Sequence, residues 1–240
     1  MENARSRSRA RLEERERVIL DAATELFASD GFHATSTRKI ASAAGVSEGT
    51  VFHYFGSKNE LMLGILDRFY NGVLNPRAAE ILDTVMETRA RLYALARHHV
   101  HSLAEDNALM MRLLQVYVGV DFELVKDSHE SPLRTLNRSY VQYFDRIARE
   151  GMQRGELRSD LAVRPLRDLF FGTLEYGLRT HTSGVGQDGL DTYIDQLMEP
   201  LWTALAVHQP SANLSERLIE RLEKACETVE RAAEGLQDKG

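Results

Sequence analysis

The sequence has few of the residues that break or cross-link a chain. Its 240 residues include five prolines and one cysteine, Cys226. A lone cysteine cannot form an internal disulfide, and it suits the reducing cytoplasm, where we expect the protein to be located. Proline removes a backbone donor and ends or kinks a helix, so its scarcity leaves room for long helices. We interpret Cys226 as a small core residue.

Long apolar runs and alternating patterns are also missing. No segment is apolar over the length that spans a bilayer, and the charged N-terminus has no apolar signal-peptide core, so we expect no membrane partner. No stretch alternates apolar and polar residues with a period of two, as a half-buried strand does. Apolar residues instead recur at helical spacing along most of the chain. This pattern predicts an all-α protein.

A general excess of basic charge is absent too. The net charge is −6, yet residues 1–60 carry nine basic and nine acidic side chains, so the acidic excess lies in the remaining residues. A broad positive surface, the usual footprint of a nucleic-acid-binding protein, is therefore excluded. Arginines do gather locally in residues 1–12, which we expect to form a flexible basic arm. Such an arm suits either a minor groove or solvent.

The most informative stretch is residues 37–58, which read TRKIASAAGVSEGTVFHYFGSK. A hydroxyl side chain at 36–37 can cap a first short helix, and Gly45 supplies the left-handed residue that ends it. Ser47 can then cap a second helix over residues 48–54. This spacing predicts a helix-turn-helix, whose second helix enters a major groove of DNA. An αα-hairpin in another helical domain is the alternative that the spacing alone leaves open.

The residues around the motif support the DNA-binding interpretation. A helix is expected over residues 17–29 (RVILDAATELFAS), followed by Gly31 and Phe32 and then by the motif. This N-terminal quarter resembles the TetR family of bacterial transcriptional regulators. One departure is Phe52, where the family usually has tyrosine, so a hydroxyl is lost there. The resemblance implies a homodimeric repressor that binds double-stranded operator DNA.

The motif also identifies candidate DNA contacts. We expect Arg38, Thr50 and the backbone of Gly49 to contact base edges, whereas other polar residues position the head on phosphates. The complete set of expected DNA-binding residues is Thr37, Arg38, Ser47, Gly49, Thr50, His53, Tyr54 and Lys58. A helical enzyme or protein-interaction module is the remote alternative, and binding to DNA would discriminate it.

The chain divides into four predicted parts. They are a flexible arm (1–12), a helix-turn-helix DNA-binding domain (13–57), an effector-binding and dimerisation domain (58–210), and an additional C-terminal helix (211–240). A helix from Lys58 should be interrupted near Gly72 and Pro76. Further helices are expected at about 87–104, 108–118, 131–152, 163–181 and 190–207. Residues 213–236 carry a short heptad pattern, so this helix packs either on its own subunit or across the dimer. The family resemblance implies dimerisation through 163–207.

Aromatic and flexible apolar side chains are concentrated in the middle of the chain. Taken singly each suits a core, but together they can line a lipophilic cavity. The expected pocket residues are Phe69, Tyr93, Met110, Leu114, Tyr117, Phe122, Tyr140, Phe144, Phe170, Phe171 and Leu174. The TetR resemblance implies that this domain binds a small-molecule effector. We expect no bound cofactor.

A second resemblance narrows the effector. The string HSLAEDNALMMRLLQVYV and the later REGMQRGELRSDLAVRPLRDLFFGTLEYG are similar to TetR-type regulators of fatty-acid degradation that respond to long-chain acyl-CoA. This similarity implies release from DNA by an acyl-CoA. Arginine is suited to the phosphates of CoA. The candidates for that contact are Arg112, Arg134, Arg138 and Arg146. The rival within the same class is an efflux-pump regulator that senses lipophilic drugs.

Signals for catalysis or metal binding are weak. His98 and His101 lie one helical turn apart beside His99, but no cysteine is near, so we expect surface or pocket-edge histidines and no metal site. No nucleophile-elbow pattern surrounds any serine, and no glycine-rich loop links a strand to a helix. The sequence therefore does not predict an enzyme.

Overall fold

The structure is a computed structural model that describes residues 2–84, 87–105, 132–181 and 187–207. These residues are almost entirely helical, which confirms the predicted all-α class. The elements are α1 (Glu2–Ser29), α2 (Thr37–Ala43), α3 (Glu48–Phe55), α4 (Lys58–Phe69), the π-helix η1 (Tyr70–Leu74), α5 (Asn75–Asp83), α6 (Thr88–Glu105), α8 (Pro132–Gln153), α9 (Val163–His181) and α10 (Gln187–Leu205). The helices expected at 108–118 and 213–236 lie outside the described residues.

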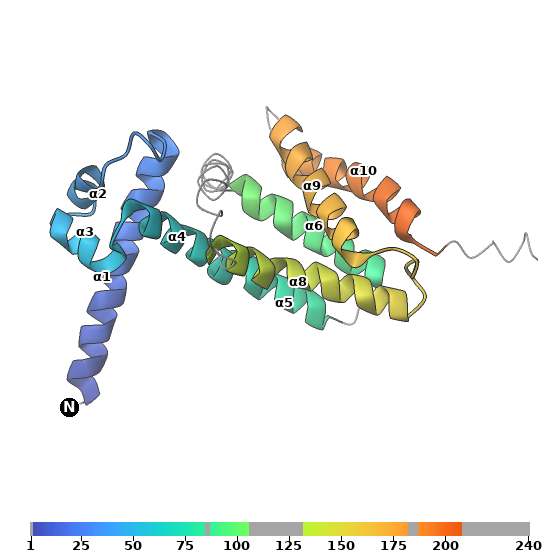
Figure 1. The fold of residues 1–240 in the computed structure, drawn as a ribbon, viewed down its shortest axis with the longest axis horizontal. Helices are drawn as coiled ribbons and strands as arrows, with labels where there is room; N and C mark the ends of the chain where they lie inside the picture. The colour runs from blue at the N-terminus through green and yellow to red at the C-terminus, as the bar shows by residue number, and fades with distance from the viewer. Residues whose placement is uncertain (1, 85–86, 106–131, 182–186, 208–240) are drawn as a thin grey trace, which may run out of the picture.

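The helices form a small head and a larger body. Figure 1 shows α1, α2 and α3 grouped at one end, with α4 leading from them into a bundle of α5, α6, α8, α9 and α10. One cluster of buried apolar side chains runs from α1 through α4 to α10, so no polar layer separates the head from the body. The continuity matters because a shift of α4 in the body must move residues that also belong to the core of the head.

Three serines start the short helices of the head. The hydroxyls of Ser36, Ser47 and Ser57 accept hydrogen bonds from backbone amides three residues further on, at 3.1–3.2 Å. Each bond satisfies one amide that the first helical turn leaves without a partner. The predicted caps of α2 and α3 are therefore confirmed.

Residues 2–12 of the expected flexible arm (1–12) are helical. They continue α1 without a break, in contrast to the expectation from their composition. The physical reason is that no glycine or proline occurs before residue 31, and arginine and glutamate are good helix formers. Arg9 also donates to Glu13 one turn later at 2.8 Å. Pairs at this spacing stabilise an exposed helix.

The expected interruption after α4 is a π-helical turn. Residues Tyr70–Leu74 form η1, and α5 follows directly with Pro76 in its first turn. A π-turn adds one residue to a helical turn and commonly lies at functional sites. The chain therefore passes from head to body through a continuous but irregular helix.

The far end of the body is closed by a short backbone clamp. The amide of Arg158 donates to the carbonyl of Leu205 at 3.0 Å, and the amide of Val207 donates to the carbonyl of Glu156 at the same distance. These bonds fix the turn after α8 to the end of α10. No helix among the described residues has the length and apolar character that crossing a membrane requires.

Candidate DNA-binding head and effector cavity

The head is held together by a compact apolar core. Ile19, Ala23 and Phe27 of α1 pack with Ile40 of α2 and Val51 of α3, and all five are buried. Since α3 has one buried face, its opposite face is available to a partner. This arrangement is the one that the helix-turn-helix pattern predicts.

The turn between α2 and α3 has the predicted geometry. Gly45 has a φ of 64°, in the left-handed region where a side chain is disfavoured. The amide of Val46 donates to the carbonyl of Ala41 at 3.0 Å, and the Val46 side chain packs against the core. The turn therefore fixes the angle at which α3 leaves α2.

Four of the eight expected DNA-contacting residues are exposed on α2, α3 and the turn between them. Arg38, Gly49 and His53 are exposed, whereas Thr50 and Tyr54 are half-buried. The Thr50 hydroxyl lies 2.8 Å from the Ser47 hydroxyl, and Thr37 donates to the Glu48 carboxylate at 2.7 Å. Both hydroxyls are thus oriented by neighbours in the same motif.

Phe52 is a feature of this surface that the sequence did not predict as a contact. Its side chain lies on α3 and is 47% exposed, although it is large and apolar. An exposed apolar side chain on such a helix can contact the methyl group of thymine. Its place in the motif, one residue before His53, is the sequence feature that could have identified it as a contact.

Several charged side chains of the head form ion pairs. Lys39 forms an ion pair with Asp30, and Arg17 pairs with Glu14 and Asp21 at 2.6 and 2.8 Å. Arg38 has no carboxylate within 4.0 Å in the described part of the chain. Its guanidinium is therefore free to contact DNA.

Lys58 points inward instead of toward a phosphate. Its ammonium donates to the carbonyls of Phe32 and Thr35 at 2.8 and 3.0 Å, and it lies 4.4 Å from the centre of the Phe32 ring. A third carbonyl, that of His33, is 3.5 Å away. An ammonium has three donors, so these carbonyls account for them. Burial lowers the pKa of Lys58. The structure gives Lys58 a structural position, which differs from the expected phosphate contact.

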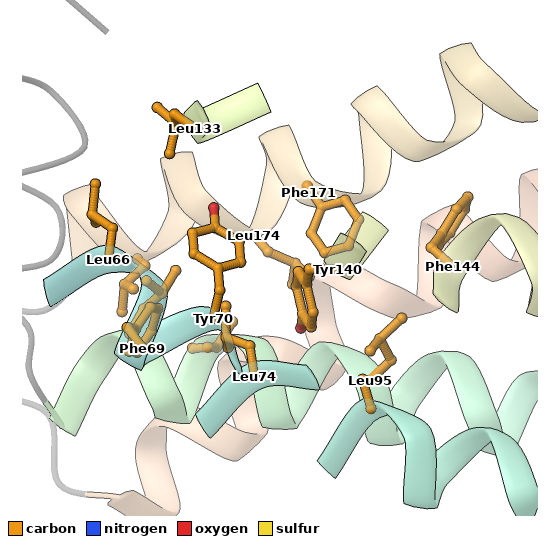
Figure 2. Close-up of a cluster of buried hydrophobic side chains, with 14 of the residues drawn as sticks. Leu66, Phe69, Tyr70, Leu74, Leu95, Leu133, Tyr140, Phe144, Phe171 and Leu174 are labelled. Carbon is orange, nitrogen blue, oxygen red and sulfur yellow. The ribbon is translucent and has the colours of Figure 1, made fainter. Parts of the chain in front are cut away.

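A cavity of about 550 Å³ lies in the body. Its walls come from the end of α4 and η1, from α6, and from α8 and α9. Figure 2 shows the aromatic side chains Phe69, Tyr70, Tyr140 and Phe171 grouped between these elements. The lining residues are Phe69, Tyr70, Leu74, His99, Leu103, Arg134, Asn137, Arg138, Tyr140, Val141, Arg164, Arg167, Asp168, Phe171 and Glu175.

Four arginines belong to this cavity. Arg134 and Arg138 come from α8, and Arg164 and Arg167 come from α9. Arg134, Arg138 and Arg164 are exposed, and none has a carboxylate within 4.0 Å in the described ranges. Arg167 pairs with Asp145 at 3.1 Å. Free guanidinium groups beside an apolar interior suit a ligand with an anionic end and a lipophilic end.

The inner wall contains buried polar groups. His99 is 5% exposed and Tyr140 is 2% exposed, and their rings stack with centroids 5.6 Å apart. Burial, with a smaller effect of the Glu175 charge, raises the pKa of Tyr70 and of Tyr140 well above the usual range for tyrosine. Both phenols are therefore neutral hydrogen-bonding groups at physiological pH.

The structure brings together only part of the expected pocket. Phe69, Tyr140 and Phe171 line the cavity, while Phe144, Phe170 and Leu174 are buried in the adjoining core. Tyr93 was wrongly placed in the pocket, because its hydroxyl donates to Glu199 of α10 at 2.8 Å, away from the cavity. Met110, Leu114, Tyr117 and Phe122 lie outside the described residues.

The arginine predictions divide in the same way. Arg134 and Arg138 line the cavity, but Arg146 lies one turn from Glu150 and donates to it at 2.9 Å on the surface of α8. Arg112 lies outside the described residues. Arg164 and Arg167 were missed, although Arg164, Arg167, Phe171 and Glu175 share one face of α9 at helical spacing. That spacing is the signal that could have found them.

The histidine cluster has separate partners rather than a shared metal. His98 lies 3.0 Å from the Leu74 carbonyl, and His101 lies 2.7 Å from the Asp191 carboxylate. No group of three or more potential metal ligands occurs among the residues that the structure describes.

Comparison with known proteins agrees with both halves of this architecture. Residues 19–65 match the profile for bacterial regulatory proteins of the tetR family, and residues 72–188 match the profile for the C-terminal region of YsiA-like proteins. The HTH-type transcriptional repressor KstR2 of Mycolicibacterium smegmatis is 30% identical over 60% of this chain and 68% of its own length. The chain belongs to the TetR family.

Two further matches, a curated sequence and a solved structure, concern fatty-acid regulation in Bacillus subtilis. The fatty acid metabolism regulator protein of Bacillus subtilis is 29% identical over 68% of this chain and 80% of its own length. The crystal structure of FadR from Bacillus subtilis in complex with stearoyl-CoA is 25% identical with a TM-score of 0.62, and the match covers 80% of this chain and 98% of that one. The TetR relatives named here are transcriptional regulators rather than enzymes.

One face of the TetR body is unusually apolar. Leu169 is 51% exposed and Tyr176 is 63% exposed on α9, and both border a shallow groove with Gly172 between them. Tyr193 and Leu197 of α10 complete the groove. These are the two helices on which the family resemblance places the dimer contact.

Proposed function

We propose that this TetR protein is a homodimeric transcriptional repressor that leaves its operator when the CoA thioester of a lipophilic acid binds the body. The observation that supports the proposal best is the cavity, which combines an aromatic interior with four arginines. CoA carries several phosphates, and an acyl group needs an apolar space. The solved relative bound to stearoyl-CoA supports the same class of effector.

The head would read DNA with a few contacts. Arg38, Thr50 and the backbone of Gly49 are the proposed base contacts, and Phe52 adds an apolar one. Thr37, Ser47, His53 and Tyr54 are the proposed contacts to the sugar-phosphate backbone. They lie on the exposed surface of α2 and α3 that was described above. Lys58 supports this surface from behind by holding the loop before α2.

The link between the two sites is α4 with η1. Phe69, Tyr70 and Leu74 line the cavity, and the start of the same helix packs on α1 and α3. A ligand that spreads the cavity walls changes the position of α4 and hence the spacing of the two heads in a dimer. Coupling of this kind needs one element that both sites bias, and α4 is that element.

Dimerisation would use the apolar face of α9 and α10. Closed dimers bury the same surface on both subunits, so an exposed apolar patch can cover its own copy. Leu169 and Tyr176 are the largest exposed apolar side chains on α9. Two heads are required because an operator of this class has two half-sites.

The test uses the full chain and a DNA fragment that it selects from its own genome. Stearoyl-CoA, free stearate, CoA and a cationic lipophilic dye are titrated against the complex, and fluorescence anisotropy reports release. We expect release by micromolar stearoyl-CoA and much less by free stearate, because the acid lacks the phosphates. The dye tests the efflux-regulator alternative. The Glu175 carboxylate in the cavity wall would favour that alternative, because it attracts a cationic ligand. Release by the dye alone would replace the proposed effector class.

A matched pair of variants tests the arginines. Arg138→Gln removes a cavity arginine, whereas Arg146→Gln removes a surface arginine of the same helix that is paired with Glu150. We expect a weaker response to acyl-CoA only for Arg138→Gln, by roughly tenfold for a charged hydrogen bond. Equal responses of the two variants would remove the phosphate role of Arg138.

A further inference from the structure

The deepest part of the cavity wall has more hydrogen-bonding capacity than the protein uses. Both ring nitrogens of His99 and the hydroxyl of Tyr140 are buried without a hydrogen-bond partner among the described residues. Nearly all buried polar atoms in native proteins have a partner, so each exception requires an explanation. Here three such atoms belong to two residues of one cavity.

The His99 ring packs against two aromatic rings of the cavity wall. The His99 ring stacks on Tyr140 at an angle of 19° and contacts the edge of Phe171 at 4.9 Å. A Glu175 carboxylate oxygen lies 3.6 Å from the Nε2 atom of His99, within ion-pair range but longer than a hydrogen bond. The aromatic packing therefore orients the His99 ring in the cavity wall, where its two nitrogens and the Tyr140 hydroxyl are buried.

A saturated acyl chain would leave this capacity unused. It has no donor or acceptor, so the buried atoms would stay without a partner while water is excluded. A ligand oxygen at this depth would be satisfied instead. A neutral imidazole offers one donor and one acceptor, and a phenol offers the same, so either a keto or a hydroxyl oxygen fits.

We propose that the acyl part of the effector carries an oxygen, as a keto or hydroxyl group, that binds His99 and Tyr140. The inference rests on the proposed function, which supplies the thioester end of the ligand. It assigns the effector to oxygenated acyl-CoA thioesters rather than to saturated fatty acyl-CoA. A site that is built to pair a ligand oxygen disfavours the analogue that lacks it.

The test compares thioesters that differ only in that oxygen. Two acyl skeletons, here called frames, are used. Cholanoyl-CoA is compared with its 3-oxo and 3-hydroxy forms, and stearoyl-CoA is compared with its 12-oxo and 12-hydroxy forms. Isothermal titration of the full chain gives Kd for each. We expect the oxygenated form to bind more tightly in at least one frame, by roughly five- to tenfold for one good hydrogen bond.

Two variants connect the preference to the residues. His99→Phe keeps an aromatic ring and Tyr140→Phe removes only the hydroxyl, and thermal melting checks that both fold. Each should reduce the preference for the oxygenated thioester without weakening the saturated one. Equal binding of saturated and oxygenated forms in both frames, or an equal loss of both in the variants, would overturn the inference. If no CoA thioester binds at all, the proposed function itself fails, and this outcome is distinct from a lost preference.

Discussion

At the scale of single residues, Lys58 shows how one half-buried cation ties parts of the head together. Its ammonium ties the carbonyls of Phe32 and Thr35 to the start of α4. Those carbonyls end the loop that leads into α2. A position that sequence similarity assigns to DNA therefore has a second role, which only the packed structure reveals.

Lys58→Met should destabilise the protein because it keeps the stem and removes the ammonium. Loss of charged hydrogen bonds to backbone carbonyls costs about 1–3 kcal/mol of unfolding free energy, which urea denaturation measures. Lys39→Met is the control, since its exposed pair with Asp30 contributes at most about 1 kcal/mol. A structural role leaves the salt dependence of DNA binding unchanged. If the slope of log K against log salt falls by about 0.9 with no loss of stability, Lys58 contacts a phosphate after all.

Thr50→Val tests base reading, because valine keeps the branched shape and removes the hydroxyl. We expect operator affinity to fall by about 1–3 kcal/mol, with little change in binding to random DNA. Ser57→Ala is the control, since it removes the cap of α4, at a cost of about 1 kcal/mol in stability, without touching a proposed DNA contact. An equal loss on operator and random DNA would show that Thr50 does not read a base.

At the scale of elements, the short helices of the head were predictable because their signals are local. The Ser47 hydroxyl bonds an amide three residues away, so the cap can be read directly from the sequence. The cavity depends on which faces of separate helices meet. Periodicity showed that Tyr93 and Phe171 lie on apolar faces, but it could not show that Tyr93 turns to α10 and Phe171 to the cavity. The helical form of residues 2–12 follows from the absence of helix breakers there, a signal that the basic composition alone does not carry.

His98 links α6 to the irregular helix η1 and makes that junction sensitive to pH. Its Nε2 atom lies 3.0 Å from the Leu74 carbonyl, and its Nδ1 atom lies 3.2 Å from the Ser102 hydroxyl. Burial is the main cause that lowers the pKa of His98; the hydrogen bond to the Leu74 carbonyl opposes this shift, and the neighbouring His99 and Arg77 reinforce it. The folded protein therefore favours the neutral ring, which donates to Leu74 and accepts from Ser102.

The sign of the pH effect follows from this lowered pKa. The unfolded chain binds a proton at His98 more readily, so stability is complete above the unfolded pKa and falls as the pH drops from there toward the folded pKa. We expect the urea concentration at the unfolding midpoint to decrease as the pH is lowered from about 7.5 to about 5.5. This interval lies above the range in which most carboxylates titrate. His98→Gln retains a donor for Leu74 but cannot titrate, so it should lose less stability over that interval. The same loss in the variant would assign the pH dependence to other groups.

At the scale of the whole molecule, charge and apolar surface are separated. The head is neutral overall and the rest of the chain is acidic, so we expect binding to DNA to depend on a few oriented groups such as Arg38 rather than on bulk attraction. The exposed apolar side chains Leu169 and Tyr176 lie on α9 of the body. The body would therefore set the distance between two heads that each bind weakly alone.

Leu169→Asp should separate the proposed dimer. In a two-fold interface the same residue occurs on both subunits, so one substitution introduces two buried charges without partners. We expect a monomer by sedimentation velocity without DNA, and weak operator binding because the monomer presents only one head. Leu12→Asp is the control, since Leu12 is 54% exposed on α1 and comparable to Leu169 at 51%. The control should remain dimeric. A dimer that withstands Leu169→Asp would place the interface on another surface, and operator binding by a true monomer would show that the two heads act independently.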